Sequence, residues 1–69
     1  MAERLANSLK ERRAELGLTQ AELADRVGVT RKTVNTVENG VFVPSTILAL
    51  KLAKALDRTV EDLFSVIED

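Results

Sequence analysis

The chain has 69 residues, of which 45% are hydrophobic and 30% are charged, so it is long enough for one folded domain and too apolar for a disordered segment. It contains no Cys and no His, which excludes the usual structural zinc sites, disulfide scaffolds and Ser-His-Asp triads. No apolar run approaches the roughly 18 residues of a membrane span, and we expect no leader, because the first residues lack a charged segment followed by an apolar one. We therefore expect a cytoplasmic protein without a metal or cofactor.

The formal net charge of -1 hides a segregation of charge along the chain. Residues 1–56 hold nine Lys or Arg against six Asp or Glu, whereas residues 57–69 hold one Arg against five acidic residues. A basic body with an acidic tail lets one face approach a polyanion while another repels it.

Helical periodicity runs through nearly the whole chain and the strand signal is negligible, so we predict an all-α protein of five helices. The first helix is expected over residues 1–16, with Leu5, Leu9 and Leu16 on one stripe, and Gly17 follows as a left-handed C-cap. Thr19 to Glu22 form a capping box that begins the second helix.

Gly28 ends the second helix, and Thr30 caps a third helix of about nine residues that ends at Asn39 and Gly40. Pro44 forces extended backbone, after which Ser45 caps a fourth helix. The capping signature of residues 59–62 begins a short fifth helix. The apolar stripe expected on the third helix is Val34, Val37 and Val41, and that on the fourth is Leu48, Leu52, Ala53 and Leu56.

The second and third helices meet at a turn that contains Gly28, and the small Ala24 lies where their backbones must approach. This spacing predicts a helix-turn-helix. The polar side of the third helix carries donors and amides that match base edges in the major groove of DNA. The simpler alternative is an ordinary solvated face. These residues are Lys32, Asn35, Thr36 and Asn39, with Arg31 at the flank.

Residues 16–24, 28–30 and 37–40 resemble the helix-turn-helix family of lambdoid phage repressors and Cro proteins, the XRE-like class of prokaryotic transcriptional regulators. The resemblance continues through residues 44–45, 52–56 and 61–64, and so covers nearly the whole chain. It implies that residues 1–69 form one compact five-helix domain of the lambda-repressor type. It also implies binding to a palindromic DNA operator as a homodimer, with one recognition helix in each major groove.

The resemblance assigns roles to individual positions. It implies that bases are read by Arg31, Lys32, Asn35 and Thr36, and that phosphates are contacted by Thr19, Gln20, Thr30 and Asn39. A helix N-terminus suits a phosphate because its backbone N–H groups are free. Thr19 also has a purely structural interpretation as a cap, and Asn39 has one as a C-cap beside Gly40.

Arg13 and Glu38 match two positions that form an ion pair between the first helix and the recognition helix in part of this family. Such a pair would orient the reading helix, even if its net contribution to stability is small. The alternative is that both side chains are simply solvated.

Val41, Phe42 and Val43 occupy a loop where family members commonly place a Lys, Arg or Tyr, so a phosphate contact there is in doubt. An apolar loop in so small a protein indicates a surface that becomes buried. We expect a dimer seam within about residues 41–69, and the alternative is that these side chains close the core. The expected seam residues are Phe42, Val43, Phe64, Val66 and Ile67.

The sequence therefore favours a sequence-specific transcriptional regulator, with repression as its expected action and double-stranded DNA as its partner. An antitoxin that grips a toxin and regulates its own operon is one alternative. A protein-interaction module that has lost DNA binding is another. An enzyme is not expected, because the acids, Lys and Ser form no nucleophile and base constellation.

Overall fold

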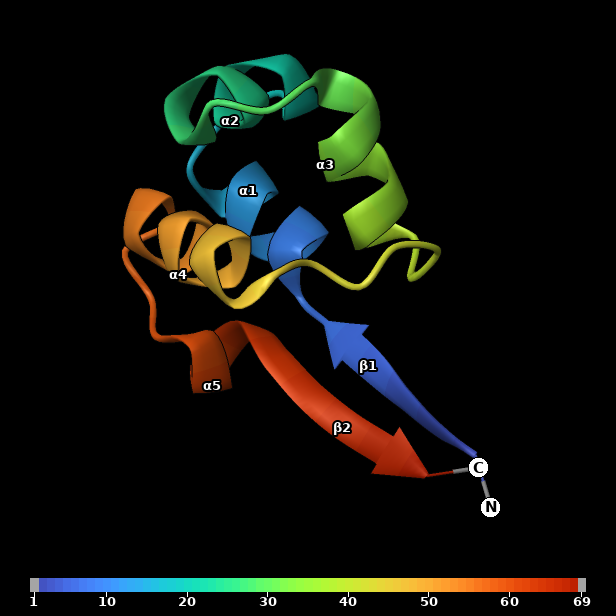
Figure 1. The fold of residues 1–69 in the computed structure, drawn as a ribbon. Coiled ribbons are helices and arrows are strands. Elements are labelled where there is room, and N and C mark those ends of the chain that lie inside the picture. Colours follow the sequence, from blue (N-terminus) through green and yellow to red (C-terminus); the bar gives the residue numbers. More distant parts are fainter. Residues whose placement is uncertain (1, 69) are drawn as a thin grey trace.

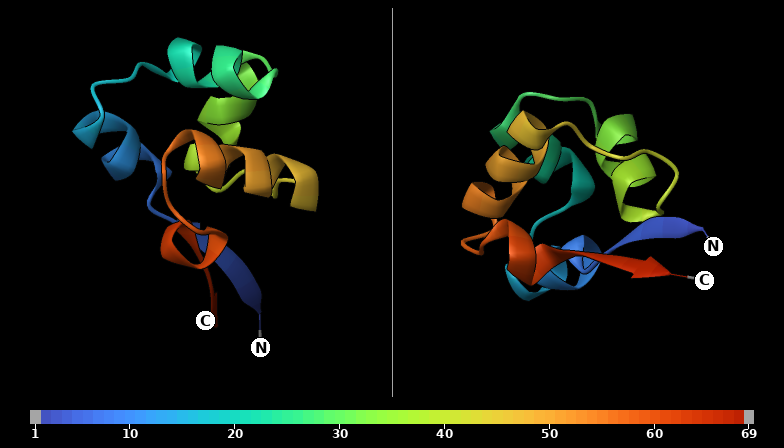
Figure 2. Two further views of the ribbon diagram at one scale, coloured as in Figure 1. Left: turned by 90° about the vertical axis from the view of Figure 1, so that its left-hand side faces the viewer. Right: turned by 60° about the horizontal axis from the view of Figure 1, so that its bottom comes forward.

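A computed structural model describes residues 2–68 of the chain. Within this range the elements are β1 (Glu3–Asn7), α1 (Leu9–Glu15), α2 (Gln20–Val27), α3 (Arg31–Glu38), α4 (Thr46–Ala55), α5 (Val60–Leu63) and β2 (Phe64–Glu68). The helices form the body, and the two strands pair into a ribbon that projects from it (Figure 1). In the two views of Figure 2 the ribbon leaves the body next to α5.

Four of the helices begin at the hydroxyl caps that the sequence predicts. The side chains of Thr19, Thr30, Ser45 and Thr59 each accept a hydrogen bond from the backbone N–H three residues later. Both predicted capping boxes are complete, because Glu22 and Asp62 accept in return from the N–H groups of Thr19 and Thr59. A cap of this kind is worth about 1 kcal/mol of stability, so these short helices have defined starts.

The predicted left-handed backbone at Gly17 is confirmed, as is the predicted end of α2 at Gly28. Gly17 follows α1 with a φ of 68°, and Gly28 ends α2 with a φ of 74°. A side chain at either position would be strained in this region of backbone space. Gly28 therefore allows the abrupt change of direction between α2 and α3.

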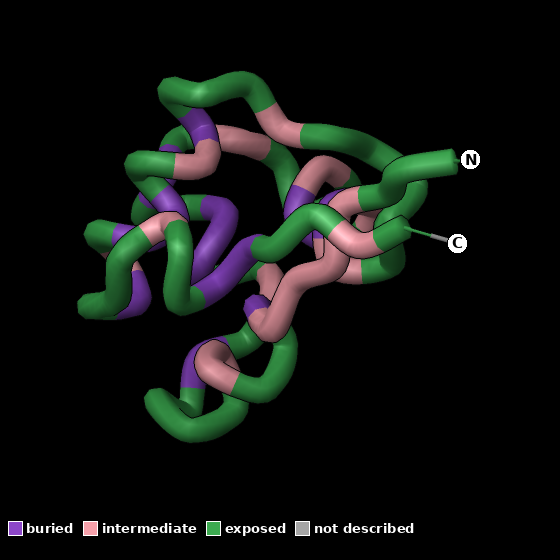
Figure 3. The backbone as a smooth tube through the Cα atoms, turned by 90° about the horizontal axis from the view of Figure 1, so that it is seen from below, coloured by how far each residue is buried: buried purple, intermediate pink, exposed green. Residues whose placement is uncertain are grey.

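The core lies between the helices and is built from apolar side chains. Its most deeply buried side chains come from α1, α2, α3 and α4 and from the residue that follows α4. They are Leu9, Leu23, Val34, Val37, Leu52 and Leu56. The four residues of the stripe predicted for the fourth helix, Leu48, Leu52, Ala53 and Leu56, are all buried. Figure 3 shows the buried positions gathered in the helical body, whereas the outer part of the ribbon is exposed or half-buried.

The prediction of an all-α protein is wrong, although the five predicted helices are present. The first helix begins at Leu9, and residues 3–7 form a strand instead. This strand pairs antiparallel with β2, so that Leu5 faces Val66 and Asn7 faces Phe64. Leu5 packs against the core from the strand, while Leu16 is 40% exposed and does not extend the Leu9 stripe. Met1, part of the predicted helix, lies outside the described residues.

Candidate nucleic-acid interface

Helices α2 and α3 form the predicted helix-turn-helix. The turn between them is closed by a hydrogen bond from the N–H of Val29 to the carbonyl of Ala24, at 3.0 Å. Ala24 is buried where the two helices approach. Leu23 and Val27 of α2 belong to the same apolar cluster as the buried side of α3. This packing sets the angle between α2 and α3.

The two sides of α3 have opposite character. Val34 and Val37 are buried, whereas Arg31, Lys32 and Asn35 are exposed. The first turn carries two cations and no acid, so this end of the helix presents hydrogen-bond donors to a partner. We call the exposed side, with Arg31, Lys32, Asn35, Thr36 and Asn39, the reading face.

The end of α3 differs from the prediction at Val41. This residue is 78% exposed and does not continue the Val34 and Val37 stripe, because the helix ends at Glu38 and the chain turns away at Gly40. The N–H groups of Val41 and Phe42 both donate to the carbonyl oxygen of Thr36, at 2.9 and 3.1 Å. The loop is therefore attached to the last turn of α3.

Arg13 of α1 and Glu38 of α3 form an ion pair with two contacts. Nε of Arg13 donates to Oε2 of Glu38 at 2.7 Å, and Nη2 donates to Oε1 at 3.1 Å. The Arg13 side chain is 14% exposed and that of Glu38 only 2%. Nη1 of Arg13 also donates to the carbonyl oxygen of Leu18 at 2.9 Å, so the guanidinium joins α1, the loop before α2, and α3.

The ionised form of Glu38 is favoured despite its burial. Burial raises the pKa of this carboxyl, but hydrogen bonds from Arg13 and Gln20 and attraction to Arg13 outweigh it, and the net pKa is lowered. The hydrogen bond to Glu38 likewise raises the pKa of Arg13, against the opposing effect of burial. Both groups are therefore charged in the folded protein.

The predicted phosphate-contact residues lie at helix ends, and each has a partner within the protein. The hydroxyls of Thr19 and Thr30 accept from the backbone as caps. Gln20 is half-buried and its Nε2 donates to Oε1 of Glu38 at 3.0 Å. Asn39 follows the last residue of α3, and its Nδ2 donates to Oδ1 of Asn35 at 3.3 Å.

Thr36 is less available than the other residues of the reading face. It is half-buried, and its hydroxyl donates to the carbonyl oxygen of Thr33 at 2.9 Å. The sequence placed Thr36 on the same side as Lys32, but nothing in the pattern indicated this bond to the preceding turn.

Sequence reasoning missed Asn7, which the structure brings to the far end of α3. Its Nδ2 donates to the carbonyl oxygen of Val37 at 3.0 Å, and its Oδ1 accepts from the N–H of Leu9 at 3.1 Å. The only sequence signal was an Asn one residue before a Ser at the start of an apolar stripe, which is typical of a cap.

The residues expected in a dimer seam divide into two groups. Phe64 is buried and belongs to the core, as the alternative interpretation had it, so it leaves the seam. Val43, Phe42 and Val66 are 68%, 48% and 65% exposed, and Ile67 is half-buried. Two further apolar residues of α4, Ile47 and Leu50, were not expected in the seam and are 68% and 58% exposed.

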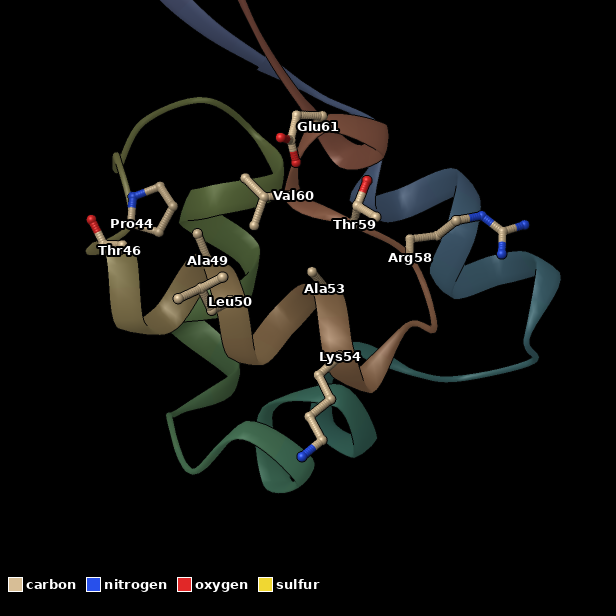
Figure 4. Close-up of a pocket in the computed structure, with 10 residues that line it drawn as sticks. All are labelled: Pro44, Thr46, Ala49, Leu50, Ala53, Lys54, Arg58, Thr59, Val60 and Glu61. Carbon is tan, nitrogen blue, oxygen red and sulfur yellow. The ribbon is translucent and has the colours of Figure 1, made fainter.

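A groove of about 650 Å³ lies between α4 and the turn that begins α5. Figure 4 shows Val60 pointing toward α4, which carries Ala49 and Leu50, and Lys54 and Arg58 also line the groove. Leu50 belongs both to this groove and to the exposed apolar residues of α4, so the groove adjoins that apolar surface.

No group of acidic side chains in residues 2–68 is arranged to hold a metal ion. No helix in the same range is both long and apolar enough to cross a membrane.

Known proteins resemble this chain in sequence and in fold. A helix-turn-helix family model matches residues 9–63. An uncharacterized HTH-type transcriptional regulator of Methanothermobacter thermautotrophicus is 55% identical over 62 residues, which cover 88% of this chain and 90% of the relative.

Two solved structures share the fold. The restriction-modification controller protein C.AhdI of Aeromonas hydrophila has a TM-score of 0.74 and 41% identity, over 78% of this chain and 82% of its own. The P22 c2 repressor, solved with a synthetic operator, has a TM-score of 0.75 and 30% identity, over 77% of this chain and 80% of its own. The five helices therefore have the lambda-repressor-like arrangement. The chain belongs to the XRE family of helix-turn-helix DNA-binding transcriptional regulators, which are not enzymes.

Proposed function

We propose that this regulator is a repressor that binds a palindromic operator as a homodimer. The observation that carries the proposal is the division of α3, which buries Val34 and Val37 and exposes Arg31 and Lys32 in its first turn. A helix anchored in this way enters a major groove with its N-terminal residues toward the base edges. Arg31, Lys32, Asn35 and Thr36 are the proposed base-reading residues.

Phosphate contacts are assigned to the ends of α2 and α3. Thr19, Gln20 and Thr30 lie where backbone N–H groups and the helix dipole favour an anion, and Asn39 offers an exposed amide at the other end of α3. The P22 c2 repressor, which has a similar fold, was solved with a synthetic operator, and this supports DNA binding by the present chain. Contacts of this kind set the register of the protein on the duplex without reading sequence.

The dimer is proposed to form through the exposed apolar residues of the loop, α4 and the ribbon. Phe42, Val43, Val66 and Ile67 remain from the expected seam, and Ile47 and Leu50 extend the surface along α4. Because the loop is hydrogen-bonded to Thr36, a contact made there also positions α3. A two-fold dimer must place its two reading helices about 34 Å apart, one turn of DNA.

The bound dimer would repress transcription by occupying DNA that RNA polymerase needs. A protein that binds DNA in this way acts in the cytoplasm, where bacterial and archaeal DNA lies. Selection of binding sites from a randomised DNA pool, followed by mobility shifts at defined salt, tests the proposal. We expect a palindromic site with half-sites one helical turn apart. Failure to bind any DNA at low salt would contradict it and favour an interaction module, and copurification of a second small protein would favour the antitoxin alternative.

A further inference from the structure

A chain of hydrogen bonds connects the buried ion pair with the reading face. Oε1 of Glu38 accepts from Nε2 of Gln20 at 3.0 Å, and Oε1 of Gln20 accepts from Nδ2 of Asn35 at 3.5 Å. Oδ1 of Asn35 in turn accepts from Nδ2 of Asn39 at 3.3 Å. We call Gln20, Asn35 and Asn39 the amide relay.

The chemistry at the inner end gives the relay one direction. An arginine side chain only donates hydrogen bonds, and an ionised carboxylate only accepts them. Gln20 must therefore turn its NH₂ group toward Glu38, which leaves its oxygen for Asn35. Asn35 must then turn its own NH₂ group toward Gln20 and its oxygen toward Asn39. Each bond decides which way the next amide faces.

The relay runs from the interior to the surface that is proposed to meet DNA. The Glu38 side chain is 2% exposed, Gln20 is half-buried, and Asn35 and Asn39 are exposed. An amide that can turn over matches a base edge that donates or one that accepts, because its two ends are nearly the same shape. An amide with fixed polarity distinguishes the acceptors of guanine from the donor groups of adenine or cytosine at the same place.

We propose that Glu38, acting through Gln20, fixes the donor and acceptor ends of the Asn35 amide and so sets the base preference of that residue. Gln20 and Glu38 are then positioning residues for base selection, in addition to any phosphate contact by Gln20. This inference rests on the proposed operator reading, but the relay itself is a property of the free protein. The two are therefore tested separately.

The first test needs no DNA. The chain has four side-chain amides, Asn7, Gln20, Asn35 and Asn39, so their NH₂ signals are easily assigned in a nitrogen-15 correlation spectrum. Glu38→Gln should shift the Asn35 signals, although Asn35 does not contact Glu38 directly, and Gln20→Met should do so with the ion pair intact. Asn7, which binds the carbonyl of Val37, serves as the internal control. Asn35 signals that move no more than those of Asn7 in both variants would overturn the relay.

The second test measures Kd for the selected operator and its single-base-pair variants. Asn35→Ala identifies the base pair that Asn35 reads. Gln20→Met should reduce discrimination at that pair from about tenfold or more to about twofold, while preferences at other pairs persist. Lys51→Ala, an exposed change on α4, is the control and should change nothing.

The outcomes separate the relay from the proposed function. If Gln20→Met weakens binding to every variant by the same factor, Gln20 acts only on phosphate and the inference is overturned. If the wild type binds all DNA sequences with the same Kd while NMR shows that the relay is intact, operator reading is contradicted. The proposed role of the relay in base selection is then contradicted as well. If the wild type is operator-specific but Glu38→Gln leaves the Asn35 NH₂ signals unchanged, the relay alone is contradicted.

Discussion

Asn7 and Val37 join the ribbon to the reading helix, through a 3.0 Å hydrogen bond from Nδ2 of Asn7 to the carbonyl oxygen of Val37. The two residues are 30 positions apart in the chain. The same side chain accepts from the N–H of Leu9 at the start of α1. One amide therefore connects β1, α1 and the last turn of α3.

Asn7→Ala should destabilise the protein by about 1 to 2 kcal/mol, because the N–H of Leu9 loses its acceptor and the carbonyl of Val37 keeps only the N–H of Gly40 as a donor. Urea unfolding followed by circular dichroism measures this change. Ser65→Ala, an exposed change on β2, is the matched control and should stay within about 0.5 kcal/mol of the wild type. A similarly small effect for Asn7→Ala would show that the bond does not contribute.

Arg13→Met should be destabilising by about 3 kcal/mol, because the almost fully buried Glu38 loses its charge partner. The double variant Arg13→Met, Glu38→Leu should recover most of that loss, since apolar packing can replace a buried ion pair. It should nevertheless bind operator more weakly than the wild type, because the reading helix has lost its orienting contact. A double variant that is as unstable as Arg13→Met would contradict the burial of the pair, and one that binds like the wild type would remove its orienting role.

Stability should be lost as the pH falls below about 4.5. The pKa of Glu38 is lowered from an ordinary value of 4.5, and the pKa values of Glu22 and Asp62 are lowered by hydrogen bonds from the Thr19 and Thr59 backbones. In this range the unfolded chain binds more protons than the folded one. The contribution of these carboxylates to the free energy of unfolding is therefore fully present above their unfolded pKa values, and it is lost as the pH falls through their folded pKa values.

Thermal midpoints measured between about pH 3 and pH 7 check this dependence. Glu22→Gln, which removes one titrating group, should flatten the acid limb. A midpoint that rises as the pH falls through this range would reverse the sign and contradict the assignment.

The proposed dimer depends on Phe42. Truncation to Ala should weaken association by about 1 to 3 kcal/mol if this ring is a central anchor, as measured by sedimentation equilibrium at several concentrations. Leu16→Ala is the control, since Leu16 is also partly exposed but lies outside the proposed surface. A wild type that stays at 7.6 kDa at tens of micromolar, with and without operator, is the result that the dimer does not allow.

The helix starts were predictable from sequence because capping is local. Thr19 and Glu22 are three residues apart, and their reciprocal bonds need no other part of the chain. The ribbon was not predictable in this way, because Leu5 becomes part of a strand only when Val66 is beside it. The spacing of two residues between Phe64 and Val66 was a weak strand signal that helical periodicity elsewhere obscured.

The candidate site likewise has contacts that were predictable from sequence and contacts that depend on tertiary packing. Arg13 and Glu38 were identified through the family resemblance, and the structure places them in contact. The bond from Gln20 to Glu38 depends on the angle between α2 and α3, which packing sets and local sequence does not. Burial also decided the status of Phe64, which is the first residue of β2, directly after α5, and is buried in the core.

The first turn of α3, with Arg31 and Lys32, is proposed to read bases. The most direct test compares Kd values of the wild type and the double variant Arg31→Ala, Lys32→Ala on the selected operator and its base-pair variants. Lys51→Ala, Lys54→Ala removes the same charge from exposed positions of α4 and serves as the control. We predict a loss of about 1 to 3 kcal/mol per residue on the preferred operator and a relaxed preference at particular base pairs. A double variant that ranks the operators in the wild-type order would contradict the claim, because Arg31 and Lys32 would then only position the protein on DNA.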